Sequence, residues 1–512
     1  MVATVKTFAF LGVDAIKVNV QVKISPGTSI FSIVGLGDKA IAESKERIRA
    51  AISSIGLEFP YDRITVNLSP ADLLKEGSHY DLAIAIGILI ELKIIKQEDV
   101  NNHYCLGELA LDGSLSKVNG ILPAAIEANS QNNGIICPKQ CGSEAAWAGN
   151  QDIIAAKNLI CIINHLSNKQ LLPKPQINRI SINTKYPDLK DIKGQKIAKR
   201  ALEIAAAGGH NLLMVGTPGT GKSMLAKRLP GILPELNSKE ILEINMIHSI
   251  DGKLDNSKII TQRPFRDPHH SCSMPAMVGG GTKAKPGEIS LAHNGVLFLD
   301  ELAEFPRTVL DSLRQPIENG NISISRVNAH INYPANFQLI AAMNPCKCGY
   351  LGEESKSCSR APICGKDYQS KISGPILDRM DIIINVAQID IFANHNKEQE
   401  SSEIVAKRVK KAHEIQYNRY KSEASMYNIS SKINAKINEE LIKKYIELDE
   451  ETQLLLKKSL DKLNISMRSY NRILKLARTI ADLEQSEKIN KNHILEALSY
   501  KKDLYGTAIN KK

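Results

Sequence analysis

The feature that most constrains the fold of this chain is a glycine-rich segment near its middle. The apolar run Leu212–Val215 is typical of a buried strand, and GTPGTGKS follows it at residues 216–223. The pattern G-x-x-x-x-G-K-S between a strand and a helix predicts a loop whose backbone N–H groups surround a phosphate. The predicted nucleotide-binding residues are Gly216, Thr217, Pro218, Gly219, Thr220, Gly221, Lys222 and Ser223. Within this loop we expect Lys222 to reach the outer phosphates and Ser223 to ligate Mg²⁺.

A second apolar run ends in two carboxylates that complete the predicted site. Residues 295–299 precede Asp300 and Glu301 directly. We expect Asp300 to hold Mg²⁺ together with Ser223, and Glu301 to polarise the attacking water as general base. A paired Asp-Glu favours an ATPase that activates water through a glutamate over a small GTPase. The sequence therefore predicts ATP and Mg²⁺ as the cofactors of a hydrolase.

Two further polar residues have the sequence positions that such a site requires. Asn344 follows a third apolar run, where its amide can orient the attacking water. Arg379 precedes a fourth apolar run and suits an arginine finger that reaches the nucleotide of a neighbouring subunit. A salt bridge from Arg379 to Asp378 or Asp381 is the alternative interpretation. A finger that acts on a neighbour implies a ring of subunits.

The rest of the sequence divides into parts that differ in hydrophobic periodicity. The predicted parts are an α/β domain at 1–165, a linker at 166–187, an α/β core at 188–394 and an all-helical domain at 395–512. In the first part, residues 18–22 and 64–68 alternate like strands, whereas Asp81–Leu92 has a helical pattern and Ser69–Asp72 can start a helix. In the last part the apolar residues with helical spacing are Leu454, Leu455, Leu460, Ile473, Leu476, Ile480 and Leu483.

Charge and hydropathy restrict the partners of the chain. The net charge is +11, and basic residues outnumber acidic ones from Lys397 onward. This excess is compatible with nucleic acid and equally with solvated helix faces. The apolar run Leu82–Ile90 is far shorter than the roughly 20 residues that span a bilayer. We therefore expect a cytoplasmic protein without a membrane partner.

Four cysteines lie close together in the sequence after Asn344. Cys346, Cys348, Cys358 and Cys364 offer the ligands of a tetrahedral zinc site, although their spacing is not that of a standard zinc finger. The alternative is a loop of reduced thiols. The pair His269-His270 is interpreted as part of an insert loop with a capping role, and metal ligation is the alternative.

The order of these motifs resembles that of the AAA+ ATPases, and several longer stretches are more specific. They are RPFRDPHH (263–270), VGGG (278–281), PGEISLAH (286–293), LRQP (313–316) and NPC (344–346). With these stretches, essentially the whole chain is similar to the Mg-chelatase-like ATPases of the YifB/ComM family. The resemblance implies a hexameric ring and a hairpin that projects toward its pore, with Ile322–Arg326 as the first strand. It also implies a sensor arginine in a helical lid, for which Arg468 is the first candidate and Arg472 the second.

The N-terminal part resembles the Lon-protease-type domain of the ribosomal-protein-like α/β fold. In this resemblance His79 stands at the place of the nucleophilic serine and Leu122 at the place of the catalytic lysine. Without a base, a serine is not an activated nucleophile, although Ser78 lies one residue away. The fold class expected for the whole chain is therefore α/β: an inactive Lon-like domain, a P-loop AAA+ core and an all-helical lid.

Three functions are consistent with this resemblance. The first is a DNA motor of the branch-migration helicase type that acts on single-stranded or branched DNA in recombination or transformation. The second is the ATPase subunit of a metal chelatase, and the third is an ATP-dependent protease or unfoldase. The missing catalytic pair argues against the third, and the Lon-like domain, which chelatase motor subunits lack, argues against the second. The predicted catalytic residues of ATP hydrolysis are Glu301, Asn344, Arg379 and Arg468.

Overall fold

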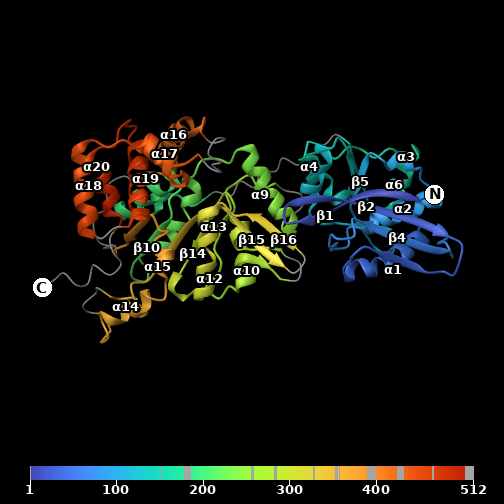
Figure 1. Cartoon of the computed structure of the whole chain (residues 1–512), viewed down its shortest axis with the longest axis horizontal. Coiled ribbons are helices and arrows are strands. Elements are labelled where there is room, and N and C mark those ends of the chain that lie inside the picture. The colour runs from blue at the N-terminus through green and yellow to red at the C-terminus, as the bar shows by residue number, and fades with distance from the viewer. Residues whose placement is uncertain are drawn as a thin grey trace.

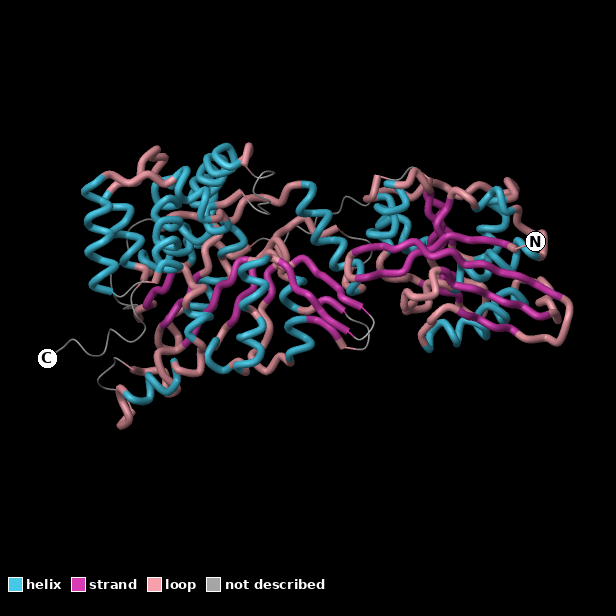
Figure 2. The backbone as a smooth tube through the Cα atoms, viewed as in Figure 1, coloured by secondary structure: helices cyan, strands magenta, loops and turns pink. Residues whose placement is uncertain are grey.

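Strands occupy the N-terminal and central parts of the chain, and its C-terminal part is built from helices (Figures 1 and 2). Figure 1 places the N-terminal part at one end of the molecule and the C-terminal helices at the other, with the P-loop core between them. The structure is a computed structural model that describes residues 2–149, 152–177, 186–254, 259–281, 285–326, 329–351, 356, 358–388, 399–423, 432–463 and 466–501. The side chains of residues 325, 326, 329, 330 and 460–463 lie outside this description.

The N-terminal part is a mixed sheet whose strands arise from alternating apolar residues. In β2 (Asp14–Ser25), Val18, Val20 and Val22 are buried, and the residues between them are half-buried. The strands expected at 18–22 and 64–68 are confirmed. The spatial order is β3 (Phe31–Val34), β4 (Arg63–Ser69), β2, β1 (Ala3–Leu11), β5 (His103–Cys105), β8 (Gly134–Pro138) and β9 (Ile153–Ala156), with a separate hairpin of β6 (Glu108–Leu109) and β7 (Leu115–Ser116).

Helices cover this sheet, and α2 (Asp81–Glu91) packs directly on β1 and β2. The other helices are α1 (Lys39–Ser54), α3 (Gln97–Val100), α4 (Ile121–Ser130), α5 (Gly142–Ala146) and α6 (Leu159–Leu166). The helix start predicted at Ser69–Asp72 is wrong, since a turn follows β4. The backbone there pairs with the segment before α1, because Lys75 N–H donates to Leu36 O (3.1 Å) and Asp38 N–H to Lys75 O (3.0 Å).

The central part is built on a parallel sheet that contains the strand before the P-loop. Among the described residues its order is β11 (Phe265–Arg266), β14 (Val296–Leu299), β17 (Gln338–Met343), β10 (Leu212–Val215) and β18 (Ile382–Asn385). Side chains of β10 alternate between two apolar clusters, Leu212 and Met214 on one face and Leu213 and Val215 on the other. Because every pair is parallel, the carboxyl ends of β10, β14 and β17 meet at one edge of the sheet.

Several helices and two hairpins surround this sheet. The helices are α7 (Lys196–Gly208), α8 (Lys222–Ala226), α9 (Ser238–Asp251), α10 (Met274–Val278), α11 (Glu288–Leu291), α12 (Arg307–Ser312), α13 (Arg314–Asn319), α14 (Ile363–Gln369) and α15 (Gly374–Leu377). The hairpins are β12 (Gly279–Gly280) with β13 (Lys285–Pro286), and β15 (Asn321–Arg326) with β16 (Ala329–Pro334). The second hairpin directly precedes β17, as the resemblance implied, and Ile322, Ile331 and Tyr333 fix its base in the core.

The described residues after 399 form only helices and turns. The helices are α16 (Ser402–Tyr420), α17 (Glu439–Tyr445), α18 (Glu450–Leu463), α19 (Met467–Leu483) and α20 (Lys491–Ser499). In α19 the predicted core residues Ile473, Leu476, Ile480 and Leu483 are buried. In α18, by contrast, Leu454 is 54% exposed, so its predicted place in the core is wrong.

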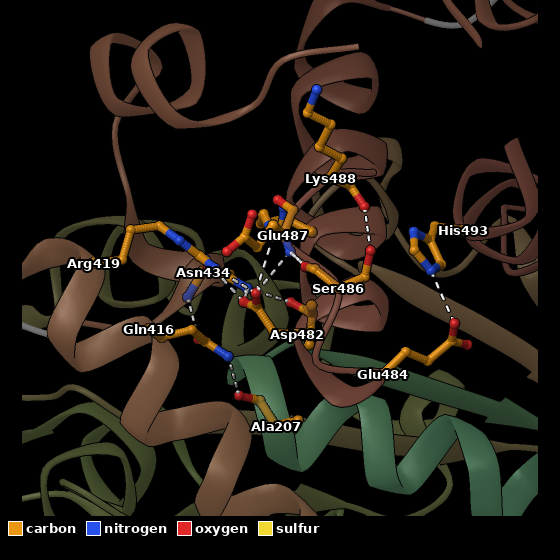
Figure 3. A network of polar contacts seen from close by, with 12 residues as sticks. Ala207, Gln416, Arg419, Asn434, Asp482, Glu484, Ser486, Glu487, Lys488 and His493 are labelled. Atoms are coloured by element: carbon orange, nitrogen blue, oxygen red, sulfur yellow. Dashed lines mark hydrogen bonds and ion pairs between the residues drawn. The ribbon is translucent and has the colours of Figure 1, made fainter. Parts of the chain in front are cut away.

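A buried carboxylate organises these C-terminal helices. Asp482 of α19 accepts hydrogen bonds from Arg419 (2.5 and 2.9 Å), Arg478 (3.1 Å) and Asn434 (2.9 Å), which come from three different segments (Figure 3). Gln416 of α16 donates to the carbonyl oxygen of Ala207 at 2.9 Å, which ties α16 to α7 of the P-loop core. The helical part is therefore attached to the core by specific polar contacts as well as by the shared apolar cluster.

Polar contacts also join the N-terminal part to the central part. Gly120 N–H, at the start of α4, donates to Ser249 O of α9 at 3.1 Å. The Ser249 hydroxyl donates to the buried Glu144 carboxylate at 2.5 Å, and Lys117 donates to Leu254 O at 2.6 Å. Burial raises the pKa of Glu144, and its hydrogen bond from Ser249 acts in the opposite direction. Among the described residues, no helix is both long and apolar enough to cross a bilayer.

Candidate nucleotide site

The predicted P-loop forms an open turn between β10 and α8. Gly219 and Gly221 have left-handed backbone torsions (φ +79° and +87°), which L residues with a side chain rarely adopt. No atom lies within 4 Å of the position that a Cβ would take at either glycine, so the backbone there borders open space. Helix α8 ends at Ala226, shortly before Pro230, which cannot continue a helix.

Lys222 bends back over this loop and joins it to the end of β17. Its ammonium group donates to the carbonyl oxygens of Gly216 (2.6 Å) and Thr217 (3.0 Å) and to Asn344 Oδ1 (3.2 Å). Burial lowers the pKa of Lys222, and the carboxylates of Asp300 and Glu301 oppose that shift. Asn344 thus presents its oxygen to the lysine, which leaves its NH₂ group as the donor that can orient a water molecule.

The predicted metal ligands are already in contact. The Ser223 hydroxyl donates to Asp300 Oδ2 at 2.5 Å, at the carboxyl end of β14. A hydroxyl and a carboxylate are oxygen ligands of the kind that Mg²⁺ takes, and the neighbouring ammonium group suits phosphate oxygens. This donor set therefore fits a magnesium nucleotide.

Glu301 follows in a left-handed conformation (φ +53°), which turns the chain sharply after β14. A non-glycine residue in this region is strained, and such strain is commonly found at functional sites. Its side chain is 53% exposed, so it can contact solvent water as a general base must.

One cavity brings these residues together. Its volume is about 390 Å³, and Lys222, Ser223, Asp300, Glu301 and Asn344 all line it. The glycine-rich loop forms one wall and the ends of β14 and β17 form the other. Residues from three separate sequence motifs are therefore adjacent, as their positions at parallel strand ends predict.

The segment after β11 also approaches this cavity, although no sequence pattern predicted this contact. His270 Nδ1 lies 3.3 Å from Glu301 Oε2, and the His270 ring is tilted over that of His269 at a centroid distance of 4.1 Å. Burial raises the pKa of Asp267, and the negative charge of Asp300 acts in the same direction. The RPFRDPHH stretch was the sequence signal, but it does not indicate which of its residues face the site.

Arginines of that stretch hold the segment in place. Arg266 makes two hydrogen bonds to Glu288, from Nε at 2.5 Å and from Nη2 at 2.7 Å. Arg263 donates to the carbonyl oxygens of Pro234 and Asn294, both at 2.8 Å. The first pair joins RPFRDPHH to PGEISLAH, so two of the recognised stretches are in direct contact.

The two arginines predicted to act in catalysis meet at a different place. Arg379 Nη2 lies 2.8 Å from Glu318 Oε1, and Arg468 Nη2 lies 3.3 Å from the same oxygen. Arg379 is only 6% exposed, and it also donates to the carbonyl oxygens of Arg314 (3.2 Å) and Pro375 (2.7 Å). Neither arginine belongs to the described lining of the cavity. The alternative interpretation gave Arg379 a salt bridge to Asp378 or Asp381, but its ion-pair partner in the structure is Glu318.

Two other arginines were singled out in the sequence, Arg472 as the second candidate for the sensor arginine and Arg326 in the hairpin. Arg472 lies 3.3 Å from Asp381 and is largely buried, so it is held inside its own chain. Strand β15 includes Arg326, but the Arg326 side chain lies outside the described residues, and its role stays a prediction.

The four cysteines predicted as zinc ligands come together at the end of β17. Cys346 and Cys348 have their sulfurs 3.0 Å apart, and Cys358 and Cys364 have theirs 3.3 Å apart. Their loop lies against the P-loop, since a Cβ at Gly349 would be 2.8 Å from Cδ of Pro218.

The segment that resembles a protease site is closed. His79 is buried, its Nε2 is 2.9 Å from Phe8 O, and burial lowers its pKa to about 4. The Ser78 hydroxyl bonds to Glu108, and Leu122 is buried with its N–H directed at Glu144 (3.2 Å). This arrangement supplies neither an exposed nucleophile at 79 nor an amine at 122.

Comparisons with known proteins cover all three parts of the chain. Family models described as subunit ChlI of Mg-chelatase, as magnesium chelatase subunit ChlI, and as the C-terminal part of that subunit match residues 20–141, 188–393 and 399–501. The chain is 44% identical to an uncharacterized protein YifB of Salmonella typhimurium and 44% identical to competence protein ComM of Haemophilus influenzae. Each alignment spans 98% of this chain and 97% of the relative. A YifB protein of Escherichia coli is 42% identical over 97% of this chain and 96% of its own length.

Because the matches extend over nearly the full length on both sides, the chain belongs to the YifB/ComM family of Mg-chelatase-like AAA+ proteins.

Proposed function

We propose that this chain is a ring-forming ATP hydrolase that acts as a DNA motor. The observation that carries the hydrolase assignment is the contact of Lys222 with Asn344 and of Ser223 with Asp300 around one cavity, with Glu301 at its rim. Membership of an AAA+ family supports the use of nucleotide and Mg²⁺. The DNA assignment draws on the likeness to a competence protein, since competence is the uptake of DNA by a cell.

The proposed division of labour follows the chemistry of each group. The P-loop residues 216–223 bind the phosphates of ATP, and Lys222 balances their charge. Ser223 and Asp300 would hold Mg²⁺, which when bound neutralises charge that develops on the phosphates. Glu301 takes the proton of the attacking water, and Asn344 orients that water.

Arg379 is assigned to the nucleotide of an adjacent subunit, and Arg468 is assigned the role of the sensor arginine in the helical lid. Their positive charges suit the transition state of phosphoryl transfer, where an arginine supplied by a neighbour is worth several orders of magnitude in rate. Both arginines pair with Glu318 in the single chain, so assembly has to exchange this partner for the phosphates. A closed ring, for which we propose a hexamer, offers one such junction to every site.

We also propose the domain boundaries that the sequence suggested. In this division an N-terminal Lon-like domain without proteolytic activity spans 1–165, a linker 166–187, the ATPase core 188–394 and a helical lid 395–512. The closed environment of His79 and Leu122 supports the loss of proteolysis. The docking of α4 on α9 supports a scaffold role for the N-terminal domain, since α9 belongs to the segment between the P-loop and Asp300.

DNA should stimulate ATP turnover if this proposal is right. We expect single-stranded and branched DNA to act more strongly than blunt duplex, and we expect binding to weaken steeply as salt rises because phosphate contacts release counterions. The measurement is phosphate release by the full-length protein with each DNA form over a salt series. Arg326→Ala, in the β15–β16 hairpin, should reduce the stimulation.

Lys39→Ala is the matched control, because that side chain is 91% exposed on α1 of the N-terminal part, where the ring model requires no DNA contact. It should retain full stimulation. Absence of stimulation at low salt by assembled rings would argue against the DNA motor. Equal losses in the two variants would show a general effect of surface charge.

A chelatase role is the second candidate, favoured by the ChlI description of all three matching family models. A chelatase subunit inserts Mg²⁺ into a porphyrin with partner subunits, and its turnover should ignore DNA. The same assay therefore separates the two functions, since a porphyrin and its partner subunits would replace DNA as the activators.

A further inference from the structure

The cysteines at the end of β17 form one compact group rather than two separate pairs. The sulfurs of Cys346, Cys348 and Cys364 all lie within 4.8 Å of one another, and Cys358 is 3.3 Å from Cys364. Cys348 is also within hydrogen-bonding reach of Cys358, which joins the two pairs. In a tetrahedral thiolate site with Zn–S bonds of about 2.3 Å, the sulfurs are roughly 3.8 Å apart. Three of the thiols therefore have the spacing of one ligand set, and Cys358 lies next to them through its contact with Cys364.

Backbone donors are arranged around these sulfurs. The N–H groups of Gly349 and Leu351 hydrogen-bond to the sulfur of Cys346, and the N–H of Tyr350 bonds to that of Cys348. Gly349 has φ +87°, and its N–H also closes a turn on Cys346 O at 3.0 Å. Backbone N–H groups in this arrangement are typical outer partners of metal-bound cysteine sulfurs.

The same segment has almost no apolar core of its own. Between 346 and 367 the only buried residues that the structure describes are Cys346, Gly349 and Gly365, and Ile363 is 59% exposed. Figure 1 shows α14, which begins at Ile363, extending away from the body of the core. A short segment without a core needs a covalent or metal crosslink to hold one conformation.

Disulfides are the competing crosslink, and the geometry argues against them. Both close sulfur pairs are separated by at least 3.0 Å, whereas a disulfide bond is about 2.05 Å long. All nine cysteines are free thiols. Cys364 lies within 4.8 Å of both Cys346 and Cys348, and this approach across the two pairs suits a shared ion better than two separate bonds.

We propose that Cys346, Cys348, Cys358 and Cys364 bind one structural Zn²⁺ ion that crosslinks the end of β17 to the start of α14. The cysteine loop lies against Pro218 of the P-loop, but none of the four cysteines is among the described residues that line the nucleotide cavity. The proposal does not depend on the function proposed above, because its test measures metal and not turnover.

The experiment is a metal analysis of the full-length protein, purified with a reductant, without a chelator and with any affinity tag removed. Elemental analysis should find about one zinc per chain. Replacement of that metal by Co²⁺ should give the intense visible absorption and the sulfur-to-cobalt charge-transfer bands of a tetrahedral thiolate site. The Cys346→Ser/Cys348→Ser variant should lose both signals, and Cys272→Ser, a thiol outside the group, should retain them.

If the double variant fails to fold, the wild-type protein still decides the matter. Blocking its thiols with a mercurial reagent in the presence of a chromogenic chelator should release about one zinc per chain. Protein that carries less than about a tenth of an equivalent of zinc, and that gives no thiolate bands with Co²⁺, overturns the proposal. So does a thiol titration that finds four fewer thiols before reduction than after it, because the cysteines would then be disulfides.

Discussion

Glu301→Gln should bind ATP normally but hydrolyse it at least ~100-fold more slowly, since loss of a general base typically costs 10²–10⁴ in rate. Glutamine keeps the size of the side chain and loses its ability to take a proton from water. The Glu301 side chain is half-exposed at the rim of the cavity and does not contact the P-loop lysine, so nucleotide affinity should persist. Phosphate release measures the rate, and a fluorescent ATP analogue measures the affinity.

Glu304→Gln is the matched control for this variant. Glu304 lies three residues further along, on the same turn after β14, and pairs with Lys371 at 3.4 Å on the surface. It should hydrolyse ATP at close to the wild-type rate, because exposed ion pairs contribute little. Normal turnover by Glu301→Gln would contradict the assignment of the base, and an equal loss in both variants would indicate damage to the turn instead.

The contact between His270 and Glu301 gives this prediction a structural context. The carboxylate that we propose to activate water lies 3.3 Å from an imidazole of the segment after β11. Arg266 and Glu288 fix that segment through their paired hydrogen bonds. The RPFRDPHH and PGEISLAH stretches are therefore support for the site as well as marks of the family.

The local sequence pattern was sufficient to predict residues that line the cavity. Asp300 and Asn344 each directly follow an apolar run that forms a buried parallel strand, and Lys222 lies one loop beyond such a run. Since parallel strands bring their carboxyl ends to one edge, identifying the strands is enough to bring these side chains together. The cysteines are a similar case, because they are close in sequence as well as in space.

Contacts between segments that are distant in the sequence could not be predicted from local sequence pattern. Nothing in the sequence around Arg379 indicates Glu318 as its partner, and its acidic neighbours Asp378 and Asp381 were the only local alternatives. The exposure of Leu454 has the same cause, since helical spacing tells which residues share a face but not which face meets the core. The turn after Ser69 depends on hydrogen bonds to the distant segment around Leu36.

Arg379→Ala should reduce ATP hydrolysis at least ~1000-fold while leaving nucleotide affinity nearly intact, because an arginine finger stabilises only the transition state. Two interpretations share this outcome. In one, Arg379 acts on the nucleotide of a neighbouring subunit. In the other, it is a structural residue whose ion pair with Glu318 and hydrogen bonds to Arg314 O and Pro375 O hold α13 against α15.

Mixing experiments and Glu318→Gln separate the two. In an equal mixture of Arg379→Ala and Lys222→Ala subunits, about a quarter of the ring junctions pair an intact P-loop with an intact finger, so activity should reappear although each variant alone is inactive. Glu318→Gln removes the ion pair and keeps the arginine, so it should retain most of the turnover if Arg379 is a finger. The structural role would be established by two results together. The mixtures would stay inactive although both variants assemble, and Glu318→Gln would be as impaired as Arg379→Ala. Loss of the ion pair alone would then account for the loss of activity, with no contribution from the junction between subunits.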